Sequence, residues 1–433
     1  MVYKRYMSRF LLPLAAVLLL FSSCTGLQES TASASYPIRE KQEKPAPSGE
    51  ADSAADQKGV AVKPELPATA EDEKKPESAP DPLAAYLDRM DIKRQIGQLF
   101  LVEVRHPETG QLITRMNEAF REWAADLQPG GYILFADNLR NPQQTRELIA
   151  DLQSLTTIPP FIALDEEGGV VSRLTAVPAM GGIPVPSARV IGASGYTAKA
   201  REAARTIAKQ LKDLGFSVNF APVADIHIPG TGGTMGERSY GTEAQLVSRM
   251  ACAFSKTLED EGILSVAKHF PGHGAAYGDS HTEKTVLDAS REILTRREML
   301  PFSALIKQGI GGIMTGHIIV PSLDNSGKPA SLSGIISRNL LRDEMDYNGL
   351  VFTDSLRMGG VTAFYNAVEL PLLAFEAGAD ILLMPVAALE SRQRLLEALE
   401  TGRIPQQRLR ESLNRIALAK RKFLSPDDIT PSP

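Results

Sequence analysis

The sequence has no excess of positive charge, and its apolar runs are short. Its 433 residues include 47 Lys and Arg against 52 Asp and Glu, for a formal net charge of −5. Proteins that bind nucleic acid usually carry a basic excess or patch. The apolar run near the N-terminus, from Phe10 to Phe21, has twelve residues, whereas a permanent membrane-spanning helix needs about 20. The composition therefore points neither to nucleic acid nor to a permanent membrane span in this run.

The same apolar run has the flanks of a secretory signal, which we assign to residues 1–24. Positive residues precede it, and two serines lead from it to Cys24. The segment Phe21-Ser-Ser-Cys24 resembles the lipobox of bacterial lipoproteins. This resemblance implies that Cys24 is lipidated and becomes the first residue of the mature protein. The alternative is an ordinary cleaved signal followed by an accidental cysteine.

Cysteine is scarce, because Cys252 is the only one besides Cys24. No intrachain disulfide is expected once Cys24 carries lipid, so an oxidising compartment adds nothing to stability. Cys252 lies in an apolar helical pattern, which predicts a buried structural thiol.

Residues 25–82 differ in composition from the rest of the chain. They contain eight prolines, many small and charged residues, and a single aromatic residue, Tyr36. Such a segment cannot bury enough apolar surface to offset the entropy of ordering, so we predict a disordered tether. A lipid on Cys24 and this tether would hold the remaining chain at a bacterial membrane, in the cell envelope, on the periplasmic or extracellular face.

Residues 83–425 form one block, and 426–433 are predicted to be a disordered tail. In the block, short apolar runs alternate with amphipathic stretches, which predicts an α/β fold, a single (β/α)8 TIM barrel. No Gly-x-Gly-x-x-Gly follows the first run, which weakens a dinucleotide-binding alternative. The expected strands are 98–103, 131–135, 161–165, 217–222, 265–270, 312–317, 350–354 and 379–384. The expected helices include 142–155, 198–214, 244–261, 295–308 and 337–345.

Glycines stand between these helices and the strands that follow, where helices commonly end on a glycine. They are Gly215, Gly262, Gly309, Gly349 and Gly378.

Polar residues gather at the expected carboxyl ends of five strands, where the active sites of such barrels lie. The third strand ends in Asp165, Glu166 and Glu167, and Asn219 and Asp225 stand at the end of the fourth. The fifth ends in Lys268 and His269, the sixth in His317 and the seventh in Asp354. A polar strand end is common taken singly, but agreement among five strands predicts one shared site.

A metal site is one interpretation of the histidines. His269, His273, His281 and His317 together with Asp354 could supply ligands. However, His269 and His273 flank a Phe-Pro-Gly turn rather than sharing a helix face, and Lys268 would repel a cation. Metal binding is therefore the weaker hypothesis.

Glycoside hydrolysis accounts for the same residues better. A retaining glycosidase needs a carboxylate nucleophile and a separate acid/base. Asp354 stands at a strand end, beside backbone amides that favour its ionised form. Asp279 and His281 lie on the glycine-rich loop after the fifth strand, and Asp279 can hold the imidazole in one tautomer while His281 transfers the proton. Histidine needs little pKa tuning for this step near neutral pH.

The motifs resemble those of glycoside hydrolase family 3, and within it the bacterial β-N-acetylglucosaminidases of cell-wall recycling. Lys268-His-Phe-Pro-Gly-His-Gly with Asp279-Ser-His281 is similar to the family signature. The segment from Asp165 to Arg173 is similar to its sugar-binding segment, Gly236-Glu-Arg238-Ser-Tyr to its second arginine motif, and Phe352-Thr-Asp354 to its nucleophile strand. The resemblance covers about residues 85–425.

This resemblance implies a role for each matched residue. Asp354 is the nucleophile and His281 the acid/base, oriented by Asp279. The sugar contacts are Asp165, Arg173, Arg238, Lys268 and His269. His273 is expected to shape the loop. His317 could either support the structure in the same way or take part in the site. The implied enzyme is a retaining exo-β-N-acetylglucosaminidase that takes peptidoglycan fragments or related aminosugar oligomers, needs no cofactor or metal, and is a monomer by default.

Several positions depart from the family pattern, and alternatives remain. Val170 and Ser172 stand where many relatives carry a basic residue and Gln, and Ser355 and Arg357 are variants after the nucleophile. These departures bear on the leaving group more than on the reaction. Larger family β-glucosidases draw their acid/base Glu from additional domains that we do not expect here. The alternatives are a phosphorylase, a β-glucosidase, and a non-catalytic lipoprotein that binds wall sugars.

Overall fold

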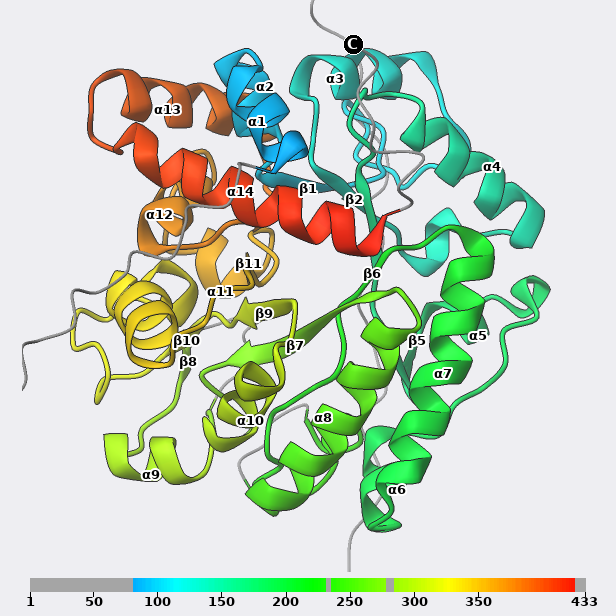
Figure 1. Cartoon of the computed structure of the whole chain (residues 1–433), viewed down its shortest axis with the longest axis vertical. Helices are drawn as coiled ribbons and strands as arrows, with labels where there is room; N and C mark the ends of the chain where they lie inside the picture. The colour runs from blue at the N-terminus through cyan, green and yellow to red at the C-terminus, as the bar shows by residue number, and fades with distance from the viewer. Residues whose placement is uncertain (1–80, 231–234, 278–283, 425–433) are drawn as a thin grey trace, which may run out of the picture. The chain divides into compact units, whose positions relative to one another are not determined.

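The computed structural model describes residues 81–230, 235–277 and 284–424, and its centre is a sheet of eight parallel strands (Figure 1). Their order is β11-β9-β7-β6-β3-β2-β1-β12. An isolated parallel bridge from Phe352 to Ile381 joins β11 to the chain just before β12. The sheet is therefore a nearly closed barrel, consistent with the predicted TIM barrel. The strands are β1 (Phe100–Glu103), β2 (Gly131–Ile133), β3 (Phe161–Leu164), β6 (Val218–Asn219), β7 (Leu264–Phe270), β9 (Gly312–Thr315), β11 (Leu350–Thr353) and β12 (Leu382–Leu383).

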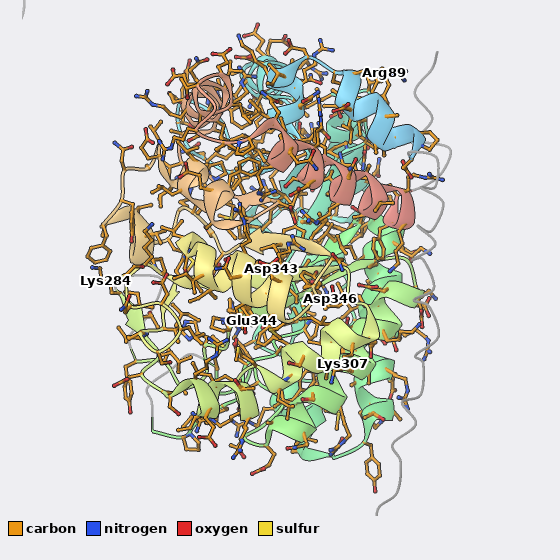
Figure 2. All side chains as sticks on the ribbon, turned by 60° about the vertical axis from the view of Figure 1, so that its left-hand side comes forward. Arg89, Lys284, Lys307, Asp343, Glu344 and Asp346 are labelled. Carbon is orange, nitrogen blue, oxygen red and sulfur yellow. The ribbon has the colours of Figure 1, made fainter. Side chains whose placement is uncertain are left out.

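Helices connect the successive strands and surround the barrel (Figure 1). Many of their charged side chains are exposed, among them Arg89, Lys307 and Asp343, which are labelled in Figure 2. None of the described helices is long and apolar enough to cross a membrane. The longer helical segments are α3 (Glu118–Leu127), α4 (Pro142–Gln153), α7 (Thr197–Leu214), α8 (Ala244–Asp260), α10 (Leu300–Gln308), η4 (Ile335–Glu344), α12 (Leu370–Ala377), α13 (Ala388–Glu400) and α14 (Gln406–Phe423).

Short elements complete the chain, some before the barrel and others inside its loops. Two helices, α1 (Pro82–Arg89) and α2 (Ile92–Gly97), precede β1. The loops contain the antiparallel hairpin β4 (Glu166–Gly168) and β5 (Val171–Ser172) and the parallel pair β8 (Thr285–Val286) and β10 (Ile318–Ile319). The remaining pieces are α5 (Arg173–Ala176), α6 (Ala188–Ala193), α9 (Arg291–Arg296), α11 (Gly359–Thr362), η1 (Ala136–Asn138), η2 (Pro178–Met180) and η3 (Ala330–Leu332).

Helix α7 shows how the sequence pattern makes the outer layer. Ala200, Ala204, Ile207 and Leu211 recur at intervals of three and four residues, which places them on one face, and all four are buried. Truncating a buried leucine such as Leu211 to alanine typically costs about 2–5 kcal/mol of stability. Burial of this face, rather than helix propensity alone, therefore holds α7 on the barrel.

Four of the five predicted helix-ending glycines have the expected left-handed backbone. They are Gly215, Gly262, Gly309 and Gly378, with φ of 94°, 90°, 84° and 122°. Gly349 was wrongly placed in this group. The left-handed residue after η4 is Asp346, with φ of 53°. A Cβ on Gly349 would lie 2.4 Å from the Tyr347 hydroxyl, so this glycine permits close packing instead.

Two helix predictions also need correction. The expected helix 295–308 is two helices, α9 and α10, because Arg297 leaves the helical region with φ −121° and ψ −78°. Pro301, which has no N–H, lies in the first turn of α10. The expected helix 337–345 begins earlier, at Ile335, and is wound as a π-helix. Periodicity located both segments but did not resolve the break or the winding.

Only one of the two cysteines, Cys252, lies among the described residues. Cys24 lies outside the described residues, as do the predicted signal peptide and the predicted tail. Cys252 is a free thiol on α8 and is half-buried rather than fully buried. Burial raises the pKa of its thiol to about 11, so the thiol stays protonated near neutral pH.

Lys420 on α14 is a charged side chain buried at the N-terminal end of the barrel, and the sequence did not single it out. It is 0% exposed. Its Nζ donates to the Gln98 side-chain oxygen at 2.9 Å and lies 5.5 Å from the centre of the Phe161 ring. Burial lowers the pKa of Lys420 to about 7. The barrel therefore encloses an amine whose charged form is costly.

Candidate active site

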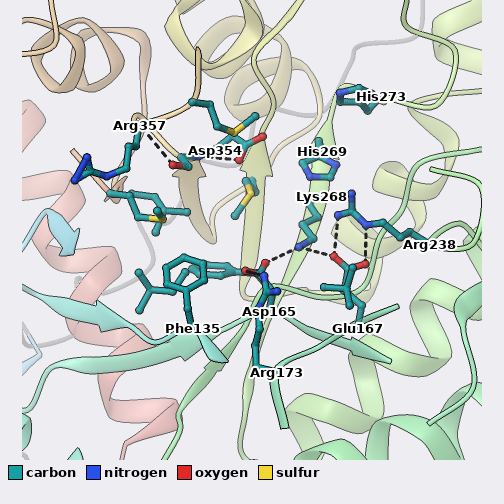
Figure 3. A pocket seen from close by; sticks show the side chains of 18 of the residues that line it. Phe135, Asp165, Glu167, Arg173, Arg238, Lys268, His269, His273, Asp354 and Arg357 are labelled. Carbon is teal, nitrogen blue, oxygen red and sulfur yellow. Dashed lines mark hydrogen bonds and ion pairs between the residues drawn. The ribbon is translucent and has the colours of Figure 1, made fainter. Parts of the chain in front are cut away.

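A cavity of about 450 Å³ opens at the carboxyl ends of the barrel strands (Figure 3). Asp165 follows β3, Lys268 and His269 belong to β7, and Asp354 follows β11. All four residues line this cavity, as the strand-end argument predicted. Arg173 and Arg238 line it from the loops after β3 and β6. Every predicted sugar contact therefore meets the predicted nucleophile at one cavity.

A network of ion pairs crosses one side of the cavity (Figure 3). The Nζ atom of Lys268 lies 2.8 Å from Oδ1 of Asp165 and 2.8 Å from Oε1 of Glu167. Arg238 donates two parallel hydrogen bonds to Glu167, at 2.9 and 2.8 Å, and Arg173 donates to Asp165 at 3.2 Å. Bidentate pairing fixes both the position and the plane of a carboxylate. The network thus holds five charged groups in fixed positions.

These contacts keep the groups ionised despite burial. Burial alone would raise the pKa of Asp165, but Lys268 and Arg173 outweigh it and lower the pKa to about 2. Burial opposes ionisation of Glu167 too, yet Lys268 and Arg238 hold its pKa below the usual range. Lys268 would lose its proton more easily because it is buried, but the two carboxylates raise its pKa. This side of the cavity, the wall formed by the ion-pair network, therefore presents fixed charges rather than proton donors near neutral pH.

Glu166 differs from its neighbour Glu167, because it supports the backbone. Its Oε2 accepts hydrogen bonds from the backbone N–H groups of Arg173 and Leu174, at 2.8 and 3.1 Å. Burial raises the pKa of Glu166. The Arg173 guanidinium stands 5.5 Å from the centre of the Phe135 ring. Glu166 thus fixes the start of α5, from which Arg173 reaches Asp165.

Asp225 organises the two histidines that flank the turn after β7. Its carboxylate accepts from Nδ1 of His269 at 2.7 Å and from the backbone N–H of His273 at 2.7 Å. A carboxylate only accepts, so Nδ1 of His269 carries the proton. Burial of Asp225 opposes its ionisation, but His269 lowers its pKa. Burial and the nearby His269 lower the pKa of His273. Asp225 thus fixes the backbone at His273, whose side chain also lines the cavity.

Asp354 stands across the cavity from Arg238 and Glu167 (Figure 3). Its backbone N–H donates to the Thr315 carbonyl, which ties β11 to β9, and the Ser355 N–H donates to its Oδ1 at 2.7 Å. Burial would raise the pKa of Asp354, but His269 and His317 outweigh it and lower the pKa. A buried carboxylate that stays ionised beside an open cavity is chemically able to attack an electrophilic carbon.

His317 does not line this cavity. Its Nδ1 lies 2.7 Å from the Ser331 hydroxyl and its Nε2 lies 2.8 Å from the carbonyl oxygen of Ser355. It therefore touches the chain next to Asp354. The other two histidines are elsewhere: His106 accepts from the N–H of Glu108 in its own turn, and His227 follows the fourth strand outside the lining.

The predicted proton-transfer pair, Asp279 and His281, lies outside the described residues. Both ends of that stretch are fixed, because Tyr277 and Val286 form an antiparallel bridge. The second end continues into β8, which pairs with β10 directly after His317. Within the described residues, no group of three or more His, Cys, Asp or Glu side chains is arranged to hold a metal ion.

Two residues at or beside the cavity were not singled out from the sequence. Phe135, at the end of the second predicted strand, lines the cavity. Glu103, at the end of the first, accepts from Nε of Arg357 at 2.6 Å and also pairs with Arg105. Arg357 lines the cavity, and its side chain is 37% exposed. The rule of polar strand ends would have identified Glu103 if it had been extended to the first strand, whereas the apolar Phe135 carries no such signal.

Known proteins are similar in sequence to the part of the chain that carries these residues. The family described as "Glycosyl hydrolase family 3 N terminal domain" matches residues 91–419. Beta-hexosaminidase A from Pseudoalteromonas piscicida is 36% identical over 345 residues, which cover 73% of this chain and 55% of that protein. Beta-hexosaminidase from Neisseria meningitidis serogroup C is 34% identical over 274 residues, which cover 62% of this chain and 75% of that protein.

Solved structures are similar as well. A glycoside hydrolase family 3 beta-N-acetylglucosaminidase from Paenibacillus sp. superposes with a TM-score of 0.72 at 34% identity, covering 77% of this chain and 63% of that one. A glycosyl hydrolase of the same family from Mycobacterium smegmatis gives 0.68 at 31% identity and is covered to 98%. The chain thus spans 55% and 63% of the Pseudoalteromonas and Paenibacillus proteins.

Proposed function

The chain belongs to glycosyl hydrolase family 3, and on this premise we propose that it is a β-N-acetylhexosaminidase. We assign it removal of a terminal β-linked N-acetylglucosamine, with retention of configuration. The names of the beta-hexosaminidase relatives support the substrate class. Within the chain, the observation that carries the proposal is an ionised Asp354 facing the charged network of Asp165, Lys268 and Arg238 across one cavity.

In the proposed reaction, Asp354 attacks the anomeric carbon while the bond to the leaving oxygen breaks and that oxygen receives a proton. The product of this first step is a covalent glycosyl-enzyme, which water then hydrolyses after giving up a proton to the same acid/base. The lowered pKa of Asp354 supports the nucleophilic role, because the carboxylate is a much stronger nucleophile than the protonated acid.

The charged network suits the sugar that remains bound. Asp165 can accept hydrogen bonds from sugar hydroxyls, and Lys268 and the arginines can donate to hydroxyl oxygens. Because their partners already fix these side chains, little side-chain freedom is lost when the sugar binds. Binding energy from this wall can therefore orient the anomeric carbon toward Asp354.

The acid/base in our proposal is His281, oriented by Asp279. Among described residues, the carboxyl groups that line the cavity are those of Asp165, Glu167 and Asp354. The pKa of each is lowered, so none of them suits proton donation near neutral pH. This supports a proton donor from another part of the chain, and the loop after β7 offers the predicted pair.

The direct test is turnover of an aryl N-acetyl-β-glucosaminide by the purified chain, with the anomer of the released sugar followed by NMR. We expect N-acetylglucosamine released first as the β-anomer. Activity on the aryl β-glucoside but not on the N-acetyl analogue would overturn the substrate assignment. Phosphate-dependent turnover with formation of a sugar 1-phosphate would identify a phosphorylase instead.

We also propose that Cys24 is lipidated and holds the enzyme at a bacterial membrane, where peptidoglycan fragments are its substrate. The lipobox-like sequence around Cys24 and the length of chain between it and α1 support this proposal. In a bacterial host, the native chain should partition with membranes, and Cys24→Ser should release it. Equal partitioning of the two proteins would rule out the lipid anchor.

A further inference from the structure

We propose that His317 is a positioning residue for the nucleophile, acting on Asp354 through Ser355. His317 follows β9 directly, and Asp354 follows β11, the neighbouring strand in the barrel. The side chain of His317 is buried, with 2% of the residue exposed. This inference rests on the proposed function, because it assigns a role within the same reaction.

The hydrogen bonds of His317 show that Nε2 carries a proton. The carbonyl oxygen of Ser355 can only accept, so Nε2 of His317 carries the proton that joins them at 2.8 Å. Its Nδ1 lies 2.7 Å from the Ser331 hydroxyl, which can donate to this nitrogen or accept from it. Ser331 is itself held, because its backbone N–H donates to the Gly316 carbonyl and its side chain is buried. The ring of His317 is thus fixed at both nitrogens.

Ser355 transmits this constraint to the nucleophile. Its carbonyl oxygen accepts from Nε2 of His317 and, at 3.0 Å, from the backbone N–H of Met358, and its own N–H donates to Oδ1 of Asp354 at 2.7 Å. The two groups belong to the two peptide units that meet at the Cα of Ser355, so fixing one limits rotation of the other. The peptide that contains the Ser355 carbonyl is also held at its N–H, since the Leu356 N–H donates to the Leu383 carbonyl at 2.9 Å.

The consequence concerns orientation rather than sugar binding. A hydrogen bond to Oδ1 leaves Oδ2 of Asp354 as the oxygen for attack, and its direction depends on the peptide that donates this bond. If the contact from His317 is lost, the peptide between Ser355 and Leu356 keeps only its backbone partners, Met358 and Leu383, so it can tilt and shift the carboxylate. Misplacement of a reacting group by about 1 Å can reduce a rate about 100-fold. The network of Asp165 and Lys268, which is separate from Ser355, should still bind the sugar.

The test compares His317→Leu, His317→Gln and Ser331→Ala in the full chain, with His106→Leu as the matched control. We expect His317→Leu to lower kcat about 10- to 100-fold while changing KM and inhibition by free N-acetylglucosamine less than about threefold. The Gln amide can replace the Nε2 donor, so His317→Gln should recover most of kcat. Loss of the Ser331 hydroxyl should lower kcat only about threefold to tenfold, and His106→Leu should leave kcat unchanged.

A positioning role also predicts slower covalent trapping. The rate of labelling by a fluorinated aminosugar should fall in parallel with kcat for His317→Leu. Unchanged kcat in folded His317→Leu, or a rise in KM equal to the fall in kcat, would overturn the inference. If that variant does not fold, His317→Gln and Ser331→Ala decide, and wild-type kcat in Ser331→Ala together with no recovery in His317→Gln would contradict it. Absence of turnover in the wild type would instead refute the proposed function.

Discussion

Replacing Lys420 by Met should stabilise the barrel, although it removes a hydrogen bond. Lys420 is 0% exposed, and among the described residues its ammonium has one hydrogen-bond acceptor, Oε1 of Gln98. Its pKa is lowered by burial to about 7, against about 10.4 for an exposed lysine. An unbranched apolar side chain of similar length fits the same space without a charge. The substitution therefore tests whether the buried amine costs the protein stability.

The magnitude follows from the two pKa values. A pKa lowered by about 3.4 units costs about 4 kcal/mol at pH 7, where half of the folded protein is protonated at Lys420. The Met variant avoids this cost but leaves Oε1 of Gln98 unpaired, which costs about 1–3 kcal/mol. The net expectation is a gain of about 2 kcal/mol in the free energy of unfolding at pH 7.

The pH dependence gives the sharper signature. Between pH 7 and 10.4 the unfolded chain binds more protons at Lys420 than the folded chain, so wild-type stability from this group rises with pH. The advantage of Lys420→Met should therefore shrink by about 2 kcal/mol between pH 7 and pH 9. The Cys252 thiol, whose pKa is raised to about 11, has the opposite sign, but it is present in both proteins and cancels in the difference.

Urea unfolding at pH 7 and pH 9 measures this difference. Lys307→Met, at an exposed position on α10 (Figure 2), is the matched control and should change stability by less than about 0.5 kcal/mol at either pH. A Lys420→Met variant that is less stable than wild type at pH 7, or whose advantage does not change with pH, would refute the reasoning.

Three further predictions concern the cavity. Asp354→Asn should abolish turnover of aryl N-acetyl-β-glucosaminides in steady-state assays, because the covalent step is lost. His281→Ala should slow substrates with poor leaving groups far more than activated aryl substrates, and equal loss on both would count against His281 as the acid. Lys268→Met should raise KM and lower the free energy of unfolding by about 3–5 kcal/mol in urea titrations, because Asp165 and Glu167 lose a buried partner; unchanged stability would contradict the ion-pair network.

The barrel could be predicted from the sequence because the patterns that mark its strands and helices are local. Apolar runs such as 161–165 and 350–354 end in polar residues, and a parallel barrel brings those ends together by geometry alone. The predicted meeting of Asp165, Lys268 and Asp354 is confirmed by the cavity they line. Their chemical roles stay predictions, since a shared position does not establish a reaction.

What the sequence missed depends on contacts between distant segments. The role of Lys420 depends on Gln98, which lies 322 residues away, and no periodicity reveals that pairing. Glu166 and Glu167 are adjacent and identical in type, but one supports α5 and the other binds Lys268. The direction of each side chain comes from the β4–β5 hairpin, which was not predicted. His317 could be assigned only after Ser355 was placed beside it.

The most direct test of the central claim is to trap the glycosyl-enzyme. The purified chain is incubated with a fluorinated N-acetylglucosamine donor that slows hydrolysis of the intermediate, then digested and mapped by mass spectrometry. Our account predicts one sugar bound covalently through the side-chain carboxylate of Asp354. Label on another residue, or turnover with no covalent adduct under conditions that trap the intermediate, would contradict it.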